Sequence, residues 1–159
     1  MPYLIDGNNL IGYLPHLDIR SPASRRELIS ELFIFHKVKK TRVEVVFDGP
    51  PDSAISQQDF NGTAFYLHYP DIGQDADLIA KKIISKETDL RQFFVVSSDR
   101  EIIEYAKSKK AKSLKCDEFH KQLKRALKQY RKIRELEKNV EPPSPLEVQF
   151  WSKIFEKKK

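Results

Sequence analysis

Four short segments of the sequence contain aspartates that could take part in metal chemistry. They are Ile5-Asp6-Gly7-Asn8-Asn9, Val46-Phe47-Asp48-Gly49, Asp75-Ala76-Asp77 and Ser97-Ser98-Asp99. Carboxylates that lie close together repel one another and become protonated unless a cation neutralises them. Because oxygen ligands select hard cations, convergence of these segments would create a site for Mg²⁺ or Mn²⁺. Such an ion activates water and stabilises a reacting phosphate, so the pattern points to a nuclease.

Several of these aspartates also have an explanation that requires no metal. Asp99, or Ser98 before it, can cap the N-terminus of the apolar helix expected to follow. Asp75 and Asp77 can complement a helix dipole by lying in the first turn of a helix. The sequence leaves both explanations open beside the metal site.

Asp48 and Asp6 differ in how well a structural explanation fits them. Asp48 precedes Gly49-Pro50-Pro51, and Asp, Gly and Pro are typical residues of turns, so a turn and a site residue are equally compatible with it. Asp6 directly follows the apolar Tyr3-Leu4-Ile5 and is followed by small or polar residues that no packing explains. A functional role is therefore favoured for Asp6.

Continuous apolar runs predict the strands that would position the aspartates. Residues 2–6, 42–48 and 92–97 have the consecutive apolar positions typical of parallel strands covered on both faces by helices. Ser24-Arg25-Arg26-Glu27 has the form of a capping box and predicts the start of a helix between the first two strands. Further strands are expected at 64–69 and 112–114, and further helices at 75–86, 100–107 and 117–137. The result is an α/β fold with a mainly parallel central sheet.

This arrangement would gather the aspartates at one edge of the sheet. Ligands of open parallel sheets bind beyond the carboxyl ends of the strands. Asp6, Asp48 and Asp99 fall at or just after such ends, and Asp75 and Asp77 begin the next helix. We therefore expect a single acidic site there.

The chain is expected to form one domain followed by a tail. Residues 1–140 are sufficient for a single domain, since domains commonly contain roughly 100–200 residues. Pro142, Pro143 and Pro145 disfavour a continuous helix, so residues 141–159 are expected to form a linker and a docking helix. No apolar run reaches the ~20 residues that span a membrane, and no targeting segment is recognised, which predicts a cytoplasmic protein. Cys116 is the single cysteine and is expected to be half-buried.

Acidic and basic residues are separated along the sequence. Residues 1–106 contain 12 basic and 16 acidic residues, whereas residues 107–159 contain 17 and 7. A nucleic-acid enzyme would use the basic part for phosphate affinity and the acidic part for metal chemistry. A solvated lysine-rich surface would produce the same separation.

The four motifs, in this order, resemble those of NYN domains. These domains are a branch of the PIN-like (FLAP nuclease) superfamily that includes the bacterial YacP-like proteins. The resemblance begins at Tyr3-Leu4-Ile5-Asp6-Gly7-Asn8-Asn9 and extends to residues 147–155, and so spans nearly the whole chain. It implies a three-layer Rossmann-like PIN/NYN fold and an endoribonuclease that uses Mg²⁺ or Mn²⁺. For the YacP-like group it implies cleavage of mRNA in association with the ribosome.

The resemblance also implies roles for individual residues. Asp6, Asp77 and Asp99 match the acidic positions that bind metal, and Asn9 matches an amide that orients water or phosphate. Asp48 and Asp75 become supporting metal-binding candidates. Two positions depart from the family pattern, since Asn8 stands where an aromatic residue is expected and Asp75 replaces a threonine or glutamate-like residue.

Basic residues of the long helix at 117–137 are the best candidates for RNA binding. They are Lys121, Lys124, Arg125, Lys128, Arg131, Lys132 and Arg134. Phosphate contacts of this kind weaken with salt, and the same face could dock on ribosomal RNA. Arg100 adjoins Asp99 and would lie near a scissile phosphate. Phe65, Tyr66 and Tyr69 could stack on bases, although core packing explains at least one of them.

Two other classes of protein are compatible with parts of the pattern. A catalytically inactive PIN-like module that binds RNA or the ribosome would keep the basic helix and use the aspartates only as caps. A phosphatase of the haloacid-dehalogenase type needs a second aspartate two residues after its nucleophilic aspartate. In this sequence the residue two positions after Asp6 is Asn8, which argues against this class. The sequence contains no glycine-rich phosphate-binding loop that would support a nucleotide switch.

Overall fold

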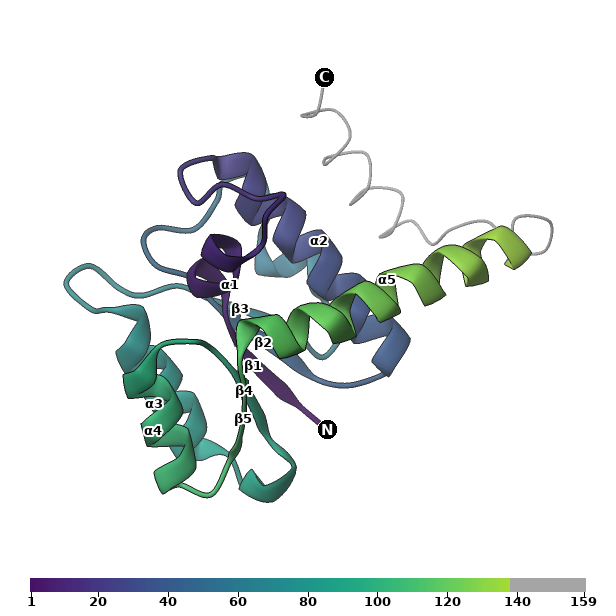
Figure 1. The fold of residues 1–159 in the computed structure, drawn as a ribbon. Coiled ribbons are helices and arrows are strands. Elements are labelled where there is room, and N and C mark those ends of the chain that lie inside the picture. The colour runs from purple at the N-terminus through teal and green to yellow at the C-terminus, as the bar shows by residue number, and fades with distance from the viewer. Residues whose placement is uncertain (138–159) are drawn as a thin grey trace.

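Five parallel strands form the central sheet (Figure 1). The structure is a computed structural model and describes residues 1–137. The strands are β1 (Tyr3–Asp6), β2 (Val43–Val46), β3 (Phe65–His68), β4 (Phe94–Val96) and β5 (Lys112–Leu114). Their order is β3-β2-β1-β4-β5 and every pairing is parallel, so all five carboxyl ends lie at one edge.

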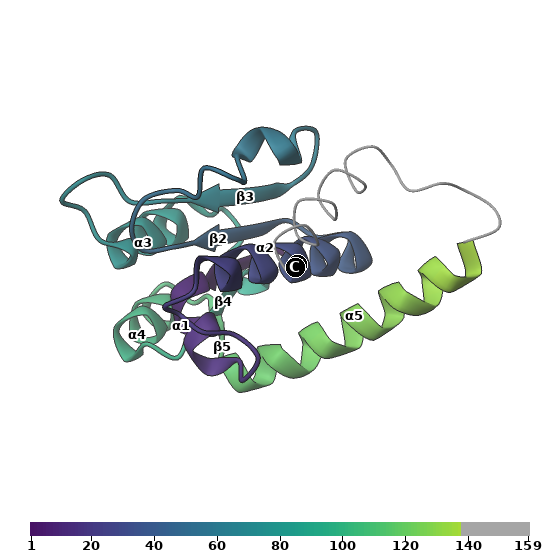
Figure 2. The ribbon, with the colours of Figure 1, turned by 90° about the horizontal axis from the view of Figure 1, so that it is seen from above.

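Helices cover both faces of the sheet (Figures 1 and 2). They are α1 (Gly7–Tyr13), α2 (Pro22–Lys39), α3 (Ala76–Lys86), α4 (Arg100–Ser108) and α5 (Cys116–Glu137), with short 3-10 turns η1 (Gln57–Phe60) and η2 (Leu90–Gln92). The core on one face is formed with α2 and α5, and the core on the other with α3 and α4. The predicted three-layer α/β fold with a parallel sheet is therefore confirmed.

Burial on both faces explains why β1 is apolar at consecutive positions. Tyr3 and Ile5 join the core beneath α2 and α5, whereas Leu4 joins the core beneath α3 and α4. Successive side chains of a strand point to opposite faces, so each of them must be apolar when both faces are covered. The ring of Tyr3 packs edge-on against Phe35, with their centroids 5.1 Å apart. Full burial of one such side chain stabilises the fold by roughly 1.5–3 kcal/mol.

The predicted start of the first long helix is wrong. The helix begins at Pro22, with Ser21 at the N-cap, instead of at a capping box on Ser24. Proline is favoured at the first helical position because its φ is already helical and it has no amide to leave unsatisfied. The hydroxyl of Ser24 instead accepts a hydrogen bond from the backbone N–H of Asp18, at 2.8 Å.

The apolar residues of α5 face the core only in the first half of the helix. Phe119 and Leu123 are buried, but Ile133 and Leu136 are 37% and 79% exposed. Figures 1 and 2 show α5 extending past the sheet, so the sheet does not cover the end of this helix. The predicted linker and docking helix at 141–159 lie outside the described residues. Within residues 1–137, no helix combines the length and apolar character required to cross a membrane.

A side chain of η1 closes the free edge of the sheet at β3. The amide nitrogen of Gln57 donates to the carbonyl of Phe65 at 2.9 Å, and its oxygen accepts from the N–H of Leu67 at 2.8 Å. These are the backbone groups that a further strand would use. Unpaired edge groups promote pairing between chains, so this contact protects β3 from association.

Gly7 is required by close packing at the start of α1, and we predict that Gly7→Ala destabilises the protein. A Cβ atom there would lie 2.4 Å from Cε1 of Phe47, whose ring is fully buried. Overpacking of this kind costs about 1–3 kcal/mol. Urea denaturation measures the change in the free energy of unfolding.

Gly12 provides a control in the same helix. A Cβ at Gly12 would meet no atom within 4 Å. Gly12→Ala is expected to leave stability unchanged or to raise it by up to about 1 kcal/mol, because alanine is the better helix former. Equal stability of the two variants would contradict the packing argument for Gly7.

Candidate functional site

The carboxyl ends of the strands surround an open cleft of about 580 Å³. All five predicted aspartates line it: Asp6, Asp48, Asp75, Asp77 and Asp99. Asn9 lines it as well. The structure therefore brings together the acidic residues that the sequence places at separate strand and helix ends.

Asp6 is held at the end of β1 by two hydrogen bonds. Its Oδ1 accepts from the backbone N–H of Asn9 at 3.3 Å and so caps α1, and its Oδ2 accepts from the hydroxyl of Ser97 at 3.1 Å. Burial raises the pKa of Asp6 to about 6, against the opposing effect of these bonds. The negative charges of Asp48 and Asp77 make a smaller contribution to this rise.

Asp75 and Asp77 reach the cleft from the N-terminus of α3. Asp75 is the N-cap, and its Oδ1 accepts from the N–H of Leu78 at 2.9 Å. Asp77 lies in the first turn. Burial raises the pKa of Asp77, and the charges of Asp99 and Asp75 add to this effect. The carboxylates therefore act on one another electrostatically across the cleft.

Asp99 and Asp6 share a supporting residue, Ser97. Asp99 caps α4 by accepting from the N–H of Glu101 at 2.9 Å, and its own N–H donates to the hydroxyl of Ser97 at 3.0 Å. Ser97 is fully buried. One hydroxyl thus links the ends of β1 and β4, a role that its position in the sequence motif did not reveal.

Asp48 lies in the loop after β2 and is fixed through its backbone. Its N–H donates to Oδ1 of Asn8 at 2.9 Å, and its carbonyl accepts from the guanidinium of Arg25 at 2.7 Å. Asn8, where the resemblance led us to expect an aromatic residue, therefore positions the loop that carries Asp48.

The amide of Asn9 has a defined orientation. Its Oδ1 accepts from the backbone N–H of Ser98 at 2.7 Å and lies 3.2 Å from Sγ of Cys116. Burial raises the pKa of the Cys116 thiol, which favours the protonated form that can donate this bond. Because a backbone N–H can only donate, Oδ1 must face Ser98, and Nδ2 is the atom left for a ligand. Cys116 is fully buried, so the expectation of a half-buried thiol is wrong.

The residues proposed for RNA binding lie outside the cleft or at its border. Arg100 is exposed at the first position of α4, beside Asp99. Six basic side chains of α5 are exposed: Lys121, Lys124, Arg125, Lys128, Arg131 and Lys132. Arg134 is half-buried.

The three aromatic residues near β3 have separate environments. Phe65 is fully buried and packs against Phe60, with centroids 4.8 Å apart, so base stacking is excluded for it. Tyr69 is half-buried and stacks on Phe47. Tyr66 is exposed, but it lines a second groove between β3 and α3 instead of the acidic cleft. An exposed aromatic residue that does line the cleft is Tyr13, which the sequence analysis missed.

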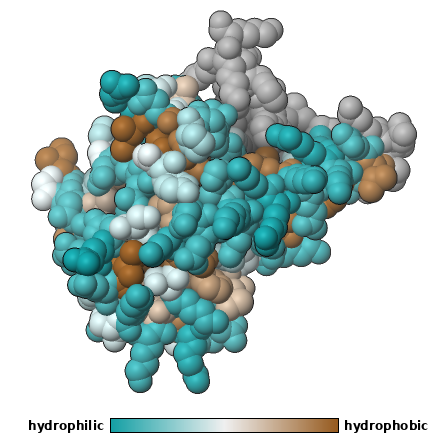
Figure 3. All heavy atoms as spheres, viewed as in Figure 1, coloured by the Kyte–Doolittle hydropathy of each residue, from teal (hydrophilic) through white to brown (hydrophobic). Residues whose placement is uncertain are grey.

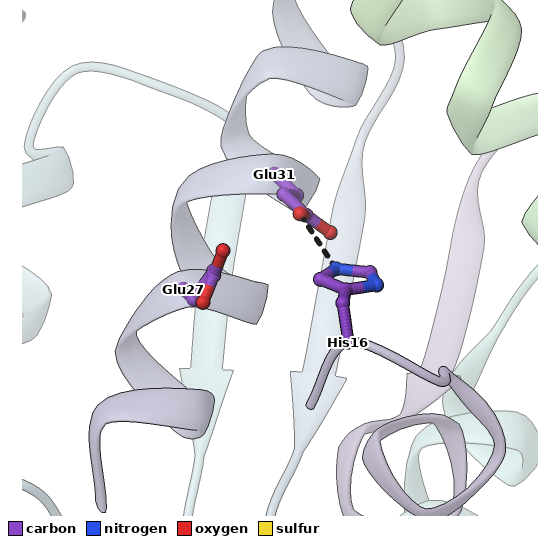
Figure 4. Close-up of side chains that lie close together, drawn as sticks. All are labelled: His16, Glu27 and Glu31. Carbon is purple, nitrogen blue, oxygen red and sulfur yellow. Dashed lines mark hydrogen bonds and ion pairs between the residues drawn. The ribbon is translucent and has the colours of Figure 1, made fainter. Parts of the chain in front are cut away.

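The most compact group of metal-ligand side chains lies elsewhere. In residues 1–137, one ligand atom from each of His16, Glu27 and Glu31 falls within 4.8 Å of the other two, and no three cleft carboxylates meet this limit. Figure 4 shows the two glutamates on adjacent turns of α2, with His16 pointing toward Glu31. The Nε2 of His16 lies 3.0 Å from a carboxylate oxygen of Glu31, a hydrogen bond that accounts for this contact without a metal.

The raised pKa of Asp6 predicts that Asp6→Asn stabilises the metal-free protein at neutral pH. In the folded chain this pKa is about 6, against an ordinary value of 3.8, so ionisation of Asp6 opposes folding. The destabilisation is absent below about pH 4, grows as the pH rises to about 6, and reaches up to about 3 kcal/mol above that. Urea denaturation at pH 4.5 and 7.5 with a chelator measures the difference.

Asp75→Asn is the matched control because asparagine caps helices as well as aspartate does. It is expected to change stability by less than about 1 kcal/mol at both pH values. An Asp6→Asn variant no more stable than the wild type at pH 7.5 would contradict the argument.

Comparisons with known structures agree with the fold. A single-residue mutant of Rae1 (YacP) from Bacillus subtilis matches with a TM-score of 0.69 and 20% identity, over 96% of this chain and 92% of that chain. A second structure of Rae1 (YacP) from the same organism has the same TM-score and identity, over 87% and 82%. No curated protein matches the sequence. At this identity the likeness concerns the fold.

The sequence itself identifies the family. A sequence model of the YacP-like NYN domain matches residues 3–158, which is nearly the entire chain. The matched segment contains every aspartate of the cleft together with Ser97 and Asn9. The chain belongs to the YacP-like NYN domain family.

Proposed function

We propose that this protein is a metal-dependent endoribonuclease that cleaves RNA in the acidic cleft. The observation that carries the proposal is the convergence of five carboxylates and Asn9 at the carboxyl edge of a parallel sheet. Membership of the YacP-like NYN family supports a nuclease-type function related to RNA. Burial is the main cause of the raised pKa of Asp77, and the repulsion from Asp99 and Asp75 that adds to it supports a role of the cleft in binding cations.

The donors of the cleft fit a hard divalent cation. They are carboxylate oxygens, which suit Mg²⁺ or Mn²⁺. Asp6, Asp77 and Asp99 would hold the ion, with Asp48 and Asp75 acting through water. Mg²⁺ usually keeps several waters and binds only one or two carboxylates directly, so the remaining carboxylate of these three would also reach the ion through water. When bound, the ion supplies an acidified water and stabilises negative charge on the reacting phosphate.

Side chains around the carboxylates have supporting roles. The Nδ2 of Asn9 can donate to a phosphate oxygen, because its Oδ1 is engaged by Ser98. Ser97 holds the carboxylate of Asp6 and the backbone of Asp99 in place. Arg100 provides positive charge beside Asp99, where a phosphate would approach.

The basic face of α5 supplies phosphate affinity that the cleft lacks. Its exposed cations are Lys121, Lys124, Arg125, Lys128, Arg131 and Lys132. We propose that the substrate is mRNA and that the ribosome is a partner, both in the cytoplasm. The basic face of α5 would contact the mRNA or the ribosomal RNA.

A catalytically inactive RNA- or ribosome-binding module is the second candidate. It is favoured by the capping bonds of Asp6, Asp75 and Asp99, and by the fact that, within residues 1–137, no three cleft carboxylates form a group as compact as His16, Glu27 and Glu31. Such a module would bind RNA through α5 and would not need a metal.

Cleavage of RNA in the presence of Mn²⁺ or Mg²⁺ tests the nuclease proposal. The protein is incubated with RNA, alone and with translating ribosomes, and product is quantified on gels. Chelation is expected to abolish cleavage, and Asp6→Asn to lower it by more than about 100-fold. Ser97→Ala is expected to lower it by roughly 10- to 100-fold, because it removes a residue that orients the carboxylate.

Asp89→Asn is the control for loss of an acidic side chain. Asp89 is exposed and does not line the cleft, and its side chain makes no capping hydrogen bond. Cleavage by this variant should equal that of the wild type. Absence of cleavage that depends on both metal and Asp6, with and without ribosomes, would leave the inactive module as the explanation.

Replacement of Lys121, Lys124 and Lys128 by glutamine tests the RNA-binding face. Loss of three phosphate contacts should weaken RNA binding at low salt and reduce the slope of log affinity against log salt by about 2. Filter binding in a chelator measures both quantities. The control replaces Lys107, Lys109 and Lys110, which carry the same charge at the end of α4 remote from Asp99. Equal losses in the two triple variants would show that only net charge matters.

A further inference from the structure

Uncharged and apolar residues also line the acidic cleft. Gly12, Tyr13 and Ile19 are among them, and the two larger side chains are 46% and 56% exposed. Figure 3 shows hydrophobic side chains on the surface of the molecule, scattered among hydrophilic ones. Single exposed apolar residues are normal, but here two occupy one cleft that otherwise carries carboxylates.

Tyr13 is positioned by the elements around it. It is the last residue of α1, whose Leu10 and Ile11 are buried in the core. Its ring lies edge-on against His120 of α5, with the centroids 6.0 Å apart. The ring is therefore supported by two helices while nearly half of its surface stays open.

Gly12 leaves space beside Tyr13 that protein packing does not explain. A Cβ at this position would meet nothing within 4 Å, in contrast to Gly7, where it would collide with Phe47. Its φ is not positive, so the backbone does not require glycine either. Glycine destabilises a helix by roughly 0.5–1 kcal/mol relative to alanine. The missing side chain enlarges the cleft beside the aromatic ring.

We propose that Gly12, Tyr13 and Ile19 form a binding site for an unpaired nucleobase of the RNA strand. This inference rests on the proposed function, because it places a nucleotide of the substrate beside the carboxylates. Bases stack on aromatic side chains through their uncharged faces. The aspartates would repel a phosphate that no cation neutralises, whereas a base carries no charge to repel. A base in the space over Gly12 can contact the ring of Tyr13 and the side chain of Ile19 together.

Binding of two short single-stranded ligands tests the proposal. One is oligoadenylate, and the other is a ribose-phosphate oligomer of the same length without bases. Fluorescence anisotropy is measured with Mg²⁺ in an Asp6→Asn background, which suppresses hydrolysis. Tyr13→Leu is expected to weaken oligoadenylate binding on the order of tenfold and to leave binding of the abasic oligomer unchanged.

Two further variants separate the base site from general effects. Gly12→Leu should weaken oligoadenylate binding to a similar extent without lowering the melting temperature, since no atom lies within 4 Å of the added Cβ. Tyr66→Leu is the control, because Tyr66 is 40% exposed but lies in the separate groove beside α3. It should bind both ligands as the parent does.

The outcomes for the base site and for the nuclease are distinguishable. Binding of oligoadenylate that depends on Tyr13, in a protein whose wild type cleaves no RNA, supports the base site and overturns the proposed activity. If the wild type shows metal-dependent cleavage, but Tyr13→Leu and its parent bind oligoadenylate equally well, the base site is overturned and the nuclease proposal stands. Affinity that depends on Tyr66 instead of Tyr13 also overturns it, as does failure of the parent to bind oligoadenylate.

Discussion

Two hydrogen bonds to the carboxylate of Asp6 connect the sheet, the first helix and the cleft. The bond from the N–H of Asn9 starts α1, and the bond from Ser97 ties the central strand to its neighbour β4. These bonds favour the charged carboxylate, but burial opposes it strongly enough to leave the pKa near 6. The fold therefore maintains a carboxylate in a place where its charge is unfavourable. Destabilisation at functional sites is common, and the rest of the core must offset it.

The separation of charge along the sequence becomes a separation in space. The carboxylates lie at the strand ends, whereas the lysines and arginines of α5 lie on a helix that extends past the sheet (Figure 2). An acidic cleft alone would repel a polyanion. In the proposed function, a basic surface on the same molecule would provide long-range attraction and leave the cleft to bind cations. The two charge clusters would then have complementary roles toward one substrate.

The sequence was sufficient to predict the sheet and the convergence of the aspartates, because parallel strands all end at one edge and β1, β2 and β4 are mostly apolar. It was insufficient for α1, whose seven residues begin with Gly7 and polar side chains that indicate a loop. The sequence also could not predict contacts between distant segments. The hydrogen bonds from Ser97 to Asp6 and from Cys116 to Asn9 join residues that only the folded chain brings together. No local pattern predicted that Tyr13 would be exposed in a cleft, because its neighbours Leu10, Ile11 and Leu14 are apolar and indicate a core segment.

Capping and catalysis are not alternatives for these aspartates. A cap requires one hydrogen bond to a backbone N–H, as Asp75 makes through Oδ1 to Leu78, and it leaves the second oxygen available to a ligand. Capping also fixes the side chain, which is what a metal ligand needs. The structural role alone, however, does not explain why so many charges face one cleft. An asparagine or serine would cap each helix as well, without raising the pKa of Asp77 by repulsion. The excess negative charge is therefore the part of the site that a structural role leaves unexplained, and it is the part that the proposed cation would neutralise.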